Sequence, residues 1–275
     1  MIDDYDFFEE DEGYEEYAPD HYFDEAQEEI KSLYENNKDD VFYLRQLQVQ
    51  LEGRFFHWVT NNALLGLLKI GYLKDYRIES KKGTSTRYFI HHSNRYPMRA
   101  IKKLEEVVQE YSKDNITRGC GYRAEDLFCK ALALRGFMPV GQKVTKYNGK
   151  KWEKTGNDLD FVFSKDMVEY GCEIKNTLGY IDKDELDTKI EMCHFFNVKP
   201  LFIMRYSPKS YNKLLFDNEG FALLFKTQIY ELGQIELVKR IGEITGLPVI
   251  STKSIPDGII DRFEKWHNKN VAKRK

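Results

Sequence analysis

The sequence of 275 residues has no apolar run close to the roughly 20 residues that a membrane-spanning helix needs. Its acidic beginning is unlike a secretory signal or a transit peptide. The four cysteines, Cys120, Cys129, Cys172 and Cys193, form no Cys-x-x-Cys pair, and the six histidines lack zinc-site spacing. No Gly-x-x-x-x-Gly-Lys-Ser/Thr phosphate loop occurs. We therefore expect a reduced, cytoplasmic protein without a membrane, zinc, disulfide or ATP partner.

Charge is distributed unevenly along the chain. There are 42 Lys or Arg and 45 Asp or Glu, but ten of the acids and none of the bases lie in residues 1–20. Removing that segment leaves 42 bases against 35 acids (45 − 10), a net charge of +7. A mildly basic body is typical of proteins that bind nucleic acid. We interpret residues 1–20 as a disordered, solvating tail, or else as a segment whose acids and aromatic rings imitate DNA and cover a basic groove.

Apolar residues at helical spacing predict three helices early in the chain, followed by two strands around a polar turn. The predicted ranges are 22–36, 41–51 and 56–70 for the helices, and 72–79 and 86–91 for the strands. This order resembles the winged helix-turn-helix, in which the third helix enters the DNA major groove and the hairpin touches the backbone. The resemblance implies a DNA-binding domain over residues 21–95. The alternative is a winged helix that serves only dimerisation or packing.

The resemblance also implies which side chains would touch DNA. Asparagine can pair bidentately with adenine, and lysine or arginine suits a phosphate. The residues expected to be exposed near the start of the third helix are Arg54, His57, Thr60, Asn61 and Asn62. Those expected to contact phosphates from the hairpin are Lys81, Lys82 and Arg87.

The rest of the chain alternates between strand-like and helical patterns. A connector helix is expected from Met98 to Ser112, inside a connecting segment 96–116, and 115–121 reads as a turn-rich joint. Beyond it, the pattern predicts an α/β domain over 117–275 with a central mixed β-sheet flanked by helices. The predicted elements are a helix over 122–135, strands near 137–146, 158–164 and 168–175, a helix over 182–197, a strand over 200–205, a strand near 221–226, and helices near 233–245 and 256–267.

The strand ending in Gly171-Cys172-Glu173-Ile174-Lys175 carries the main chemical pattern. Glu173 and Lys175 are two residues apart, so their side chains point to the same face of a strand. Asp160 lies near the start of another apolar run, Leu159 to Phe163. Two carboxylates and a lysine on neighbouring strands can hold a hard divalent cation and orient a water beside it.

Together these segments resemble the PD-(D/E)XK nuclease superfamily, over roughly residues 118 to 206. The matching pieces are a helix with a glutamate (Arg123 to Phe128), a strand with the metal aspartate (Gly156 to Phe163) and a strand with Glu-x-Lys (Tyr170 to Asn176). The resemblance implies a restriction-endonuclease-like core and Mg²⁺ as cofactor, with Mn²⁺ as a substitute. Its implied metal ligands are Asp160, Glu173, the carbonyl of Ile174 and Glu125, the last directly or through water. Lys175 would orient or deprotonate the nucleophilic water.

Each assignment has an alternative. Glu125 could be an exposed helix acid, and Glu173 with Lys175 could be an exposed edge pair. Asp158 competes with Asp160, because alternation places both on one strand face. The family pattern favours Asp160, but Asp158 departs from the Pro-Asp form that names the family. Lys189 on the next helix could reach the scissile phosphate or simply be solvated.

These features predict a Mg²⁺-dependent DNA endonuclease of the restriction type, in which the winged helix selects the site. Cutting both strands would need two active sites, so a homodimer is expected. The same core also serves junction resolvases and repair nucleases. A catalytically inactive DNA-binding regulator is the alternative from another class.

Overall fold

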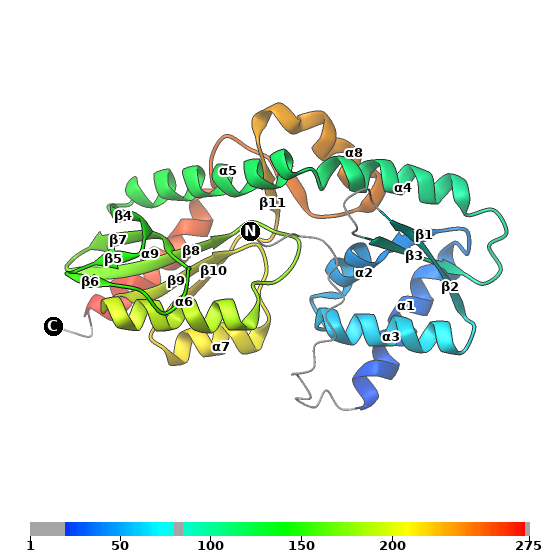
Figure 1. Ribbon diagram of the computed structural model, residues 1–275, viewed down its shortest axis with the longest axis horizontal. Coiled ribbons are helices and arrows are strands. Elements are labelled where there is room, and N and C mark those ends of the chain that lie inside the picture. Colours follow the sequence, from blue (N-terminus) through cyan, green and yellow to red (C-terminus); the bar gives the residue numbers. More distant parts are fainter. Residues whose placement is uncertain (1–19, 80–84, 273–275) are drawn as a thin grey trace. The chain divides into compact units, whose positions relative to one another are not determined.

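The computed structural model describes residues 20–79 and 85–272 and divides into two compact units (Figure 1). The N-terminal unit comprises the chain up to Asp114 together with Glu236–Leu247, and the C-terminal unit comprises the remainder. Sequence reasoning did not anticipate that 236–247 would belong to the N-terminal unit. Residues 1–19, 80–84 and 273–275 lie outside the described residues, and with them Lys81 and Lys82. Within the described ranges, no helix has the length and apolar character to cross a membrane.

The N-terminal unit combines helices with a small antiparallel sheet in the strand order β1-β3-β2. Its elements are α1 (Asp20–Asn36), β1 (Val41–Tyr43), α2 (Leu44–Leu51), α3 (His57–Lys69), β2 (Leu73–Glu79), β3 (Ser85–His91), α4 (Met98–Tyr111) and α8 (Ile235–Thr245). The prediction of one helix over 41–51 was wrong at its start. Val41 and Tyr43 are buried on alternate positions and pair with Ile90 and Tyr88 of β3, so the first three residues form a strand.

Helical spacing builds the N-terminal core. Ala26, Ile30 and Tyr34 are fully buried at intervals of four residues on α1, and they pack against Ala63 and Leu67 of α3. The Tyr34 hydroxyl donates to the carbonyl of Phe89 at 3.0 Å, which ties α1 to β3. α8 completes the unit from the far end of the sequence.

The C-terminal unit is built on a five-stranded mixed sheet, as predicted, in the strand order β10-β9-β8-β7-β4. β8, β9 and β10 are parallel, whereas β7 runs antiparallel to both β8 and β4. Its elements are α5 (Asp114–Ala133), β4 (Met138–Val144), β5 (Lys146–Tyr147), β6 (Lys150–Lys151), β7 (Leu159–Lys165), β8 (Val168–Lys175), α6 (Lys183–Phe196), β9 (Lys199–Met204), α7 (Lys209–Asp217), β10 (Phe221–Leu224), β11 (Gln228–Tyr230), a 3₁₀ turn (Leu232–Gln234), β12 (Val249–Ser251) and α9 (Asp257–Ala272).

The turn-rich joint expected at 115–121 was wrong, because α5 runs through it without a break. Ile116 and Cys120 are buried four residues apart and hold this stretch in the helix. Gly119 serves a close approach, since a Cβ there would lie 3.0 Å from the Glu231 side chain. Gly119 is therefore needed for close packing of the Glu231 side chain and does not form a turn.

Helices cover both faces of the sheet (Figure 1). α5 and α9 pack on one face through residues such as Phe128 and Phe263, and α6 packs on the other through residues such as Leu186 and Phe196. Gly171 lets α6 lie close to β8, because a Cβ at this position would meet Sγ of Cys193 at 2.6 Å. The strand that carries Glu173 is therefore held tightly against α6.

Candidate functional site

Glu173 lies at the centre of the sheet, on the third of its five strands, and is only 2 % exposed. Both of its carboxylate oxygens are held by ammonium groups. Nζ of Lys175 lies 3.0 Å from Oε1, and Nζ of Lys189 on α6 lies 2.6 Å from Oε2. The alternative of an exposed edge pair is therefore wrong, because Glu173 is a buried carboxylate with two cationic partners.

Lys175 continues the same strand face to the end of β8. Its ammonium also pairs with Oε1 of Glu185 on α6 at 2.7 Å. Burial by itself lowers the pKa of Lys175, but the charges of Glu173 and Glu185 outweigh burial and raise it. Lys175 consequently stays protonated near neutral pH, which suits a group that orients a water or stabilises negative charge better than a general base.

Lys189 was expected either to reach a phosphate or to be solvated, and the second alternative is wrong. It is 4 % exposed. Besides Glu173, its ammonium donates to the backbone carbonyl of Asp158 and lies 3.9 Å from Oδ1 of that residue. Lys189 thus links α6, the central strand and the segment that leads into β7.

Asp160 lies beside β8 where the β7–β8 ladder ends. The last ladder pair is Phe161 with Cys172, and beyond it Oδ2 of Asp160 accepts the backbone N–H of Ile174 at 2.7 Å. Burial raises the pKa of Asp160 well above the ordinary value of aspartate, and the nearby charge of Glu173 raises it further. The charge of the Glu173 carboxylate thus acts on the carboxyl group of Asp160.

The strand alternation that was expected to align Asp158 with Asp160 breaks at Asp160. Leu159 packs with Val162 on the α6 side, whereas Phe161 packs on the α5 side. On the neighbouring strand, Lys143 has a φ of 48° in the left-handed region. Gln142 pairs with Phe161 and Val144 with Leu159, so this irregularity lies directly opposite Asp160.

Glu125 extends the cluster from α5. It is half-buried, and burial raises its pKa; Lys143 opposes this rise, while Glu173 and Asp158 add to it. We refer to Glu125, Asp158, Asp160 and Glu173 as the carboxylate cluster. Glu125 is thus half-buried on α5, and the charges of Glu173 and Asp158 act on it.

The chemistry of the carboxylate cluster fits a hard divalent cation, because its donors are carboxylate oxygens whose mutual repulsion a cation would relieve. The arrangement is not a preformed metal centre. Among residues 20–79 and 85–272, no three His, Cys, Asp or Glu side chains stand together as a ready ligand set. In addition, both oxygens of Glu173 that a metal would use are held by Lys175 and Lys189.

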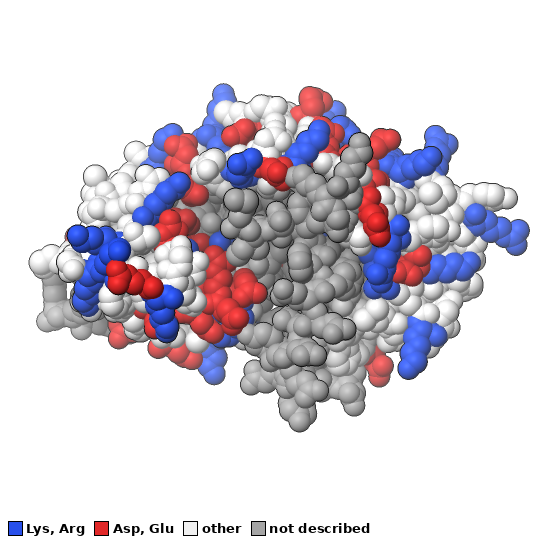
Figure 2. All heavy atoms as spheres, in the orientation of Figure 1, with Lys and Arg blue, Asp and Glu red and all other residues white. Residues whose placement is uncertain are grey.

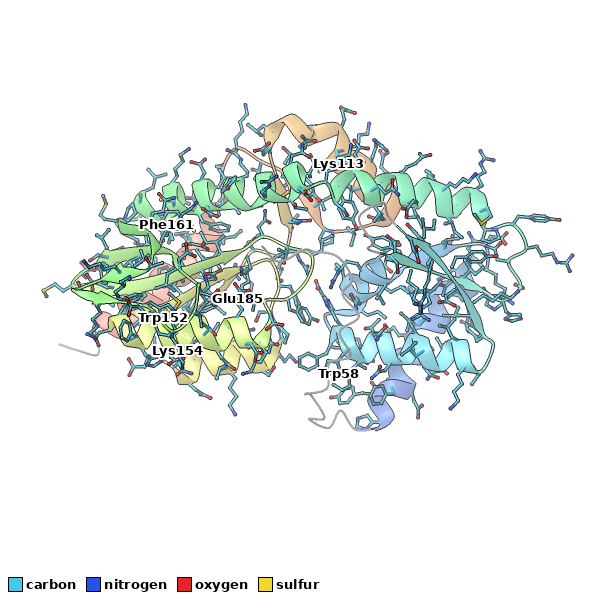
Figure 3. All side chains as sticks on the ribbon, in the orientation of Figure 1. Trp58, Lys113, Trp152, Lys154, Phe161 and Glu185 are labelled. Atoms are coloured by element: carbon cyan, nitrogen blue, oxygen red, sulfur yellow. The ribbon has the colours of Figure 1, made fainter. Side chains whose placement is uncertain are left out.

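Two further residues shape the site and were not found from the sequence. Glu185 (Figure 3) lies in the acidic first turn of α6, where Asp182 caps the helix by accepting the N–H of Asp184. Acidic side chains gather over this part of α6 (Figure 2). Asn176, directly after Lys175, is buried and donates to the carbonyls of Cys120 and Ile229. An acid in a first helical turn and a buried asparagine after a strand are common patterns, so neither was distinctive.

The residues expected to contact DNA divide into exposed and buried groups. Asn62 is exposed, and Arg54 is exposed but paired with Glu25 and Glu29 of α1. Asn61 is half-buried. The exposure predicted for two of the others was wrong: His57 contacts Arg45 at 3.1 Å and is 9 % exposed, and Thr60 is 0 % exposed.

The prediction that Arg87 contacts phosphates from the hairpin was also wrong, since its side chain does not extend toward solvent. It is 5 % exposed, its Nε lies 2.7 Å from Oδ2 of Asp75 on β2, and its guanidinium lies over the Phe89 ring. Alternation explains the error, because it turns Arg87 and Phe89 to the same face of β3. Arg87 thus stabilises the sheet.

Comparison of the chain with protein families, curated proteins and solved structures gives no match in any of the three.

Proposed function

We propose that the protein is a Mg²⁺-dependent DNA endonuclease of the restriction type. The observation that supports this most directly is the meeting of Asp160, Glu173, Lys175 and Glu125 at one end of the central strands. Paired carboxylates next to a protonated lysine suit the hydrolysis of a phosphodiester, which needs an oriented water and a stabilised phosphorane-like charge.

Mg²⁺, or Mn²⁺ in its place, would be held by Asp160, Glu173 and the carbonyl of Ile174, with Glu125 as a further ligand directly or through water. When bound, the cation supplies neutralisation of the phosphate charge and a more acidic water. Glu185 keeps the Lys175 ammonium in position and charged. Lys175 then orients the attacking water and stabilises negative charge that develops on the phosphate.

The N-terminal unit is proposed to bind DNA as a winged helix. The order of α1, β1, α2, α3, β2 and β3, with the strand order β1-β3-β2, supports this interpretation. Of the residues predicted for base contact, exposure favours Asn62 and Arg54, with half-buried Asn61 beside them. Lys81 and Lys82 remain predicted phosphate contacts.

The restriction-type assignment includes a homodimer, because two active sites are needed to cut two strands. It also includes a cytoplasmic location and activity without ATP. A Holliday-junction resolvase or repair nuclease is the alternative within the same chemistry. An inactive DNA-binding regulator is the alternative outside it.

The test uses purified wild-type protein and the variants Asp160→Ala and Glu173→Ala, with Lys154→Ala as a surface control. Each is incubated with plasmid, four-way junction or RNA, in Mg²⁺ or in EDTA. We expect discrete plasmid fragments from the wild type and the control in Mg²⁺ only, and none from the two site variants, which still bind DNA. Selective cutting of junctions would favour the resolvase. Cleavage retained by both site variants, or DNA binding without any cleavage, contradicts the proposed endonuclease.

A further inference from the structure

The backbone of Lys143 is in the left-handed region, which is unusual for a residue of a β-strand. It lies on β4, at the edge of the sheet, with a φ of 48°. The left-handed region is unfavourable for residues with a Cβ, and lysine is not among those that enter it readily. Such backbone outliers concentrate at functional sites. This one lies opposite Asp160, between the ladder pairs Gln142–Phe161 and Val144–Leu159.

The ammonium of Lys143 is directed toward an aromatic ring next to the carboxylate cluster. Its Nζ lies 5.9 Å from the centroid of the Tyr122 ring. Tyr122 precedes Glu125 by three residues on α5, so the two side chains share a helix face. Burial raises the pKa of Glu125, and the nearby charge of Lys143 acts to lower it.

Tyr122 is 58 % exposed, although tyrosine rings usually bury most of their surface. Arg118, also exposed, precedes it by four residues and extends the same face of α5. A cation, an aromatic ring and an acid therefore follow one another along this helix, with Lys143 beside the ring. Aromatic rings next to cations are the usual elements of single-strand nucleic-acid grooves.

A lysine on an edge strand commonly serves to prevent sheet-to-sheet aggregation. That role requires neither a left-handed backbone nor an aromatic ring beneath the ammonium. The carboxylate cluster repels a phosphate unless a cation lies nearby, and Lys175 and Lys189 are already engaged with Glu173.

From this geometry we propose that Lys143 and Tyr122 form a DNA-strand contact beside Glu125 of the carboxylate cluster. Lys143 binds a backbone phosphate and Tyr122 stacks on a neighbouring base. The inference rests on the proposed function for the nature of the ligand, but it assigns these residues to binding and not to the reaction.

The experiment uses the full chain with the variants Lys143→Ala, Lys143→Gly, Tyr122→Ala and Tyr122→Phe. Lys130→Ala is the matched control, because Lys130 lies on the same helix and pairs with Asp126. Binding of labelled single-stranded DNA and of a duplex with a frayed end is followed by fluorescence anisotropy in EDTA, over a series of salt concentrations. Thermal unfolding of each variant is measured in parallel.

We expect Tyr122→Ala to weaken binding about tenfold and Tyr122→Phe to restore most of it, because the phenyl ring still stacks. Lys143→Ala should lower the slope of log K against log salt by about 0.7 to 0.9, the contribution of one phosphate contact. Lys143→Gly should weaken binding in the same way while its melting temperature is unchanged or higher, since glycine relieves the left-handed strain.

Binding equal to that of Lys130→Ala in all four variants overturns the inference, even if the wild type cleaves DNA. An absence of DNA binding by the wild type overturns it as well. Weakened binding in a protein that never cleaves supports the inference and contradicts only the proposed nuclease activity.

Discussion

Replacing Lys189 with methionine tests whether Glu173 is a buried charge that depends on two ammonium groups. Methionine keeps much of the length and the apolar stem of lysine but removes the positive charge. Glu173, at 2 % exposure, would then keep Lys175 at 3.0 Å and lose its shorter contact at 2.6 Å. The carbonyl of Asp158 would also lose a donor.

The loss in free energy of unfolding expected for Lys189→Met follows from the burial of its ion pair with Glu173. Removing one partner of a buried ion pair typically destabilises a protein by about 3–5 kcal/mol, because the other charge is left uncompensated. The remaining Lys175 places the loss near the lower end, at about 3 kcal/mol. For a unit of this size, that corresponds to a decrease of roughly 6–12 °C in melting temperature.

The matched control is Lys154→Met. Lys154 also pairs with a glutamate on α6, Glu191 at 2.7 Å, but both side chains are at least half exposed. Exposed pairs contribute about 0–1 kcal/mol, so this variant should melt close to the wild type. The double variant Glu173→Met with Lys189→Met should recover much of the loss, because it leaves no unpaired buried charge. The reasoning is refuted if Lys189→Met is no less stable than Lys154→Met in urea and thermal unfolding.

Three other predictions concern the same fold. The pKa of Asp160 is raised in the folded protein, so above pH 3.8 the folded state binds more protons than the unfolded state and its stability falls as pH rises. Asp160→Asn removes this ionisation and should therefore be more stable than wild type at pH 8. In urea titrations the difference should vanish near about pH 4. Asn176→Ala should cost about 3 kcal/mol in chemical denaturation, since it removes buried hydrogen bonds to Cys120 and Ile229, and a loss below 1 kcal/mol would contradict this account. Arg87→Ala should destabilise the N-terminal unit by about 2 kcal/mol without changing DNA affinity, whereas Asn62→Ala should do the opposite in anisotropy and melting assays.

Local sequence patterns predicted the elements whose ends are set by residues within the element itself, such as helix-capping residues. α6 was placed within a residue at each end, because Asp182 caps its start and Asn197, with a φ of 60°, ends it. Elements defined by partners were missed. β1 needs its pairing to β3, and the start of α5 needs the burial of Ile116 and Cys120, and neither contact has a local pattern in the sequence.

In the site, too, features set by local sequence were predicted and features that depend on distant residues were missed. The period of two placed Glu173 and Lys175 on one face. In the structure each pairs with a different residue of α6, Glu173 with Lys189 and Lys175 with Glu185. Alternation failed at Asp160, because Leu159 and Phe161 on either side of it pack on opposite faces of the sheet, next to the irregular backbone of Lys143 on β4. The burial of Lys189 could not be predicted from the sequence either, since lysine is normally exposed and its partners, Glu173 and the carbonyl of Asp158, lie far from it in the chain.

The position of α8 has a consequence for biosynthesis. Its Thr245 carbonyl accepts from the buried amide of Gln46 at 2.9 Å, and its Arg240 pairs with Glu110 at 2.6 Å. These contacts join the first 114 residues to 236–247, so 133 further residues (247 − 114) must be translated before the N-terminal unit has all its parts. At about 5–20 residues per second, the nascent unit waits roughly 7–27 s for its last helix, with the surface that α8 covers still open to other molecules on the ribosome.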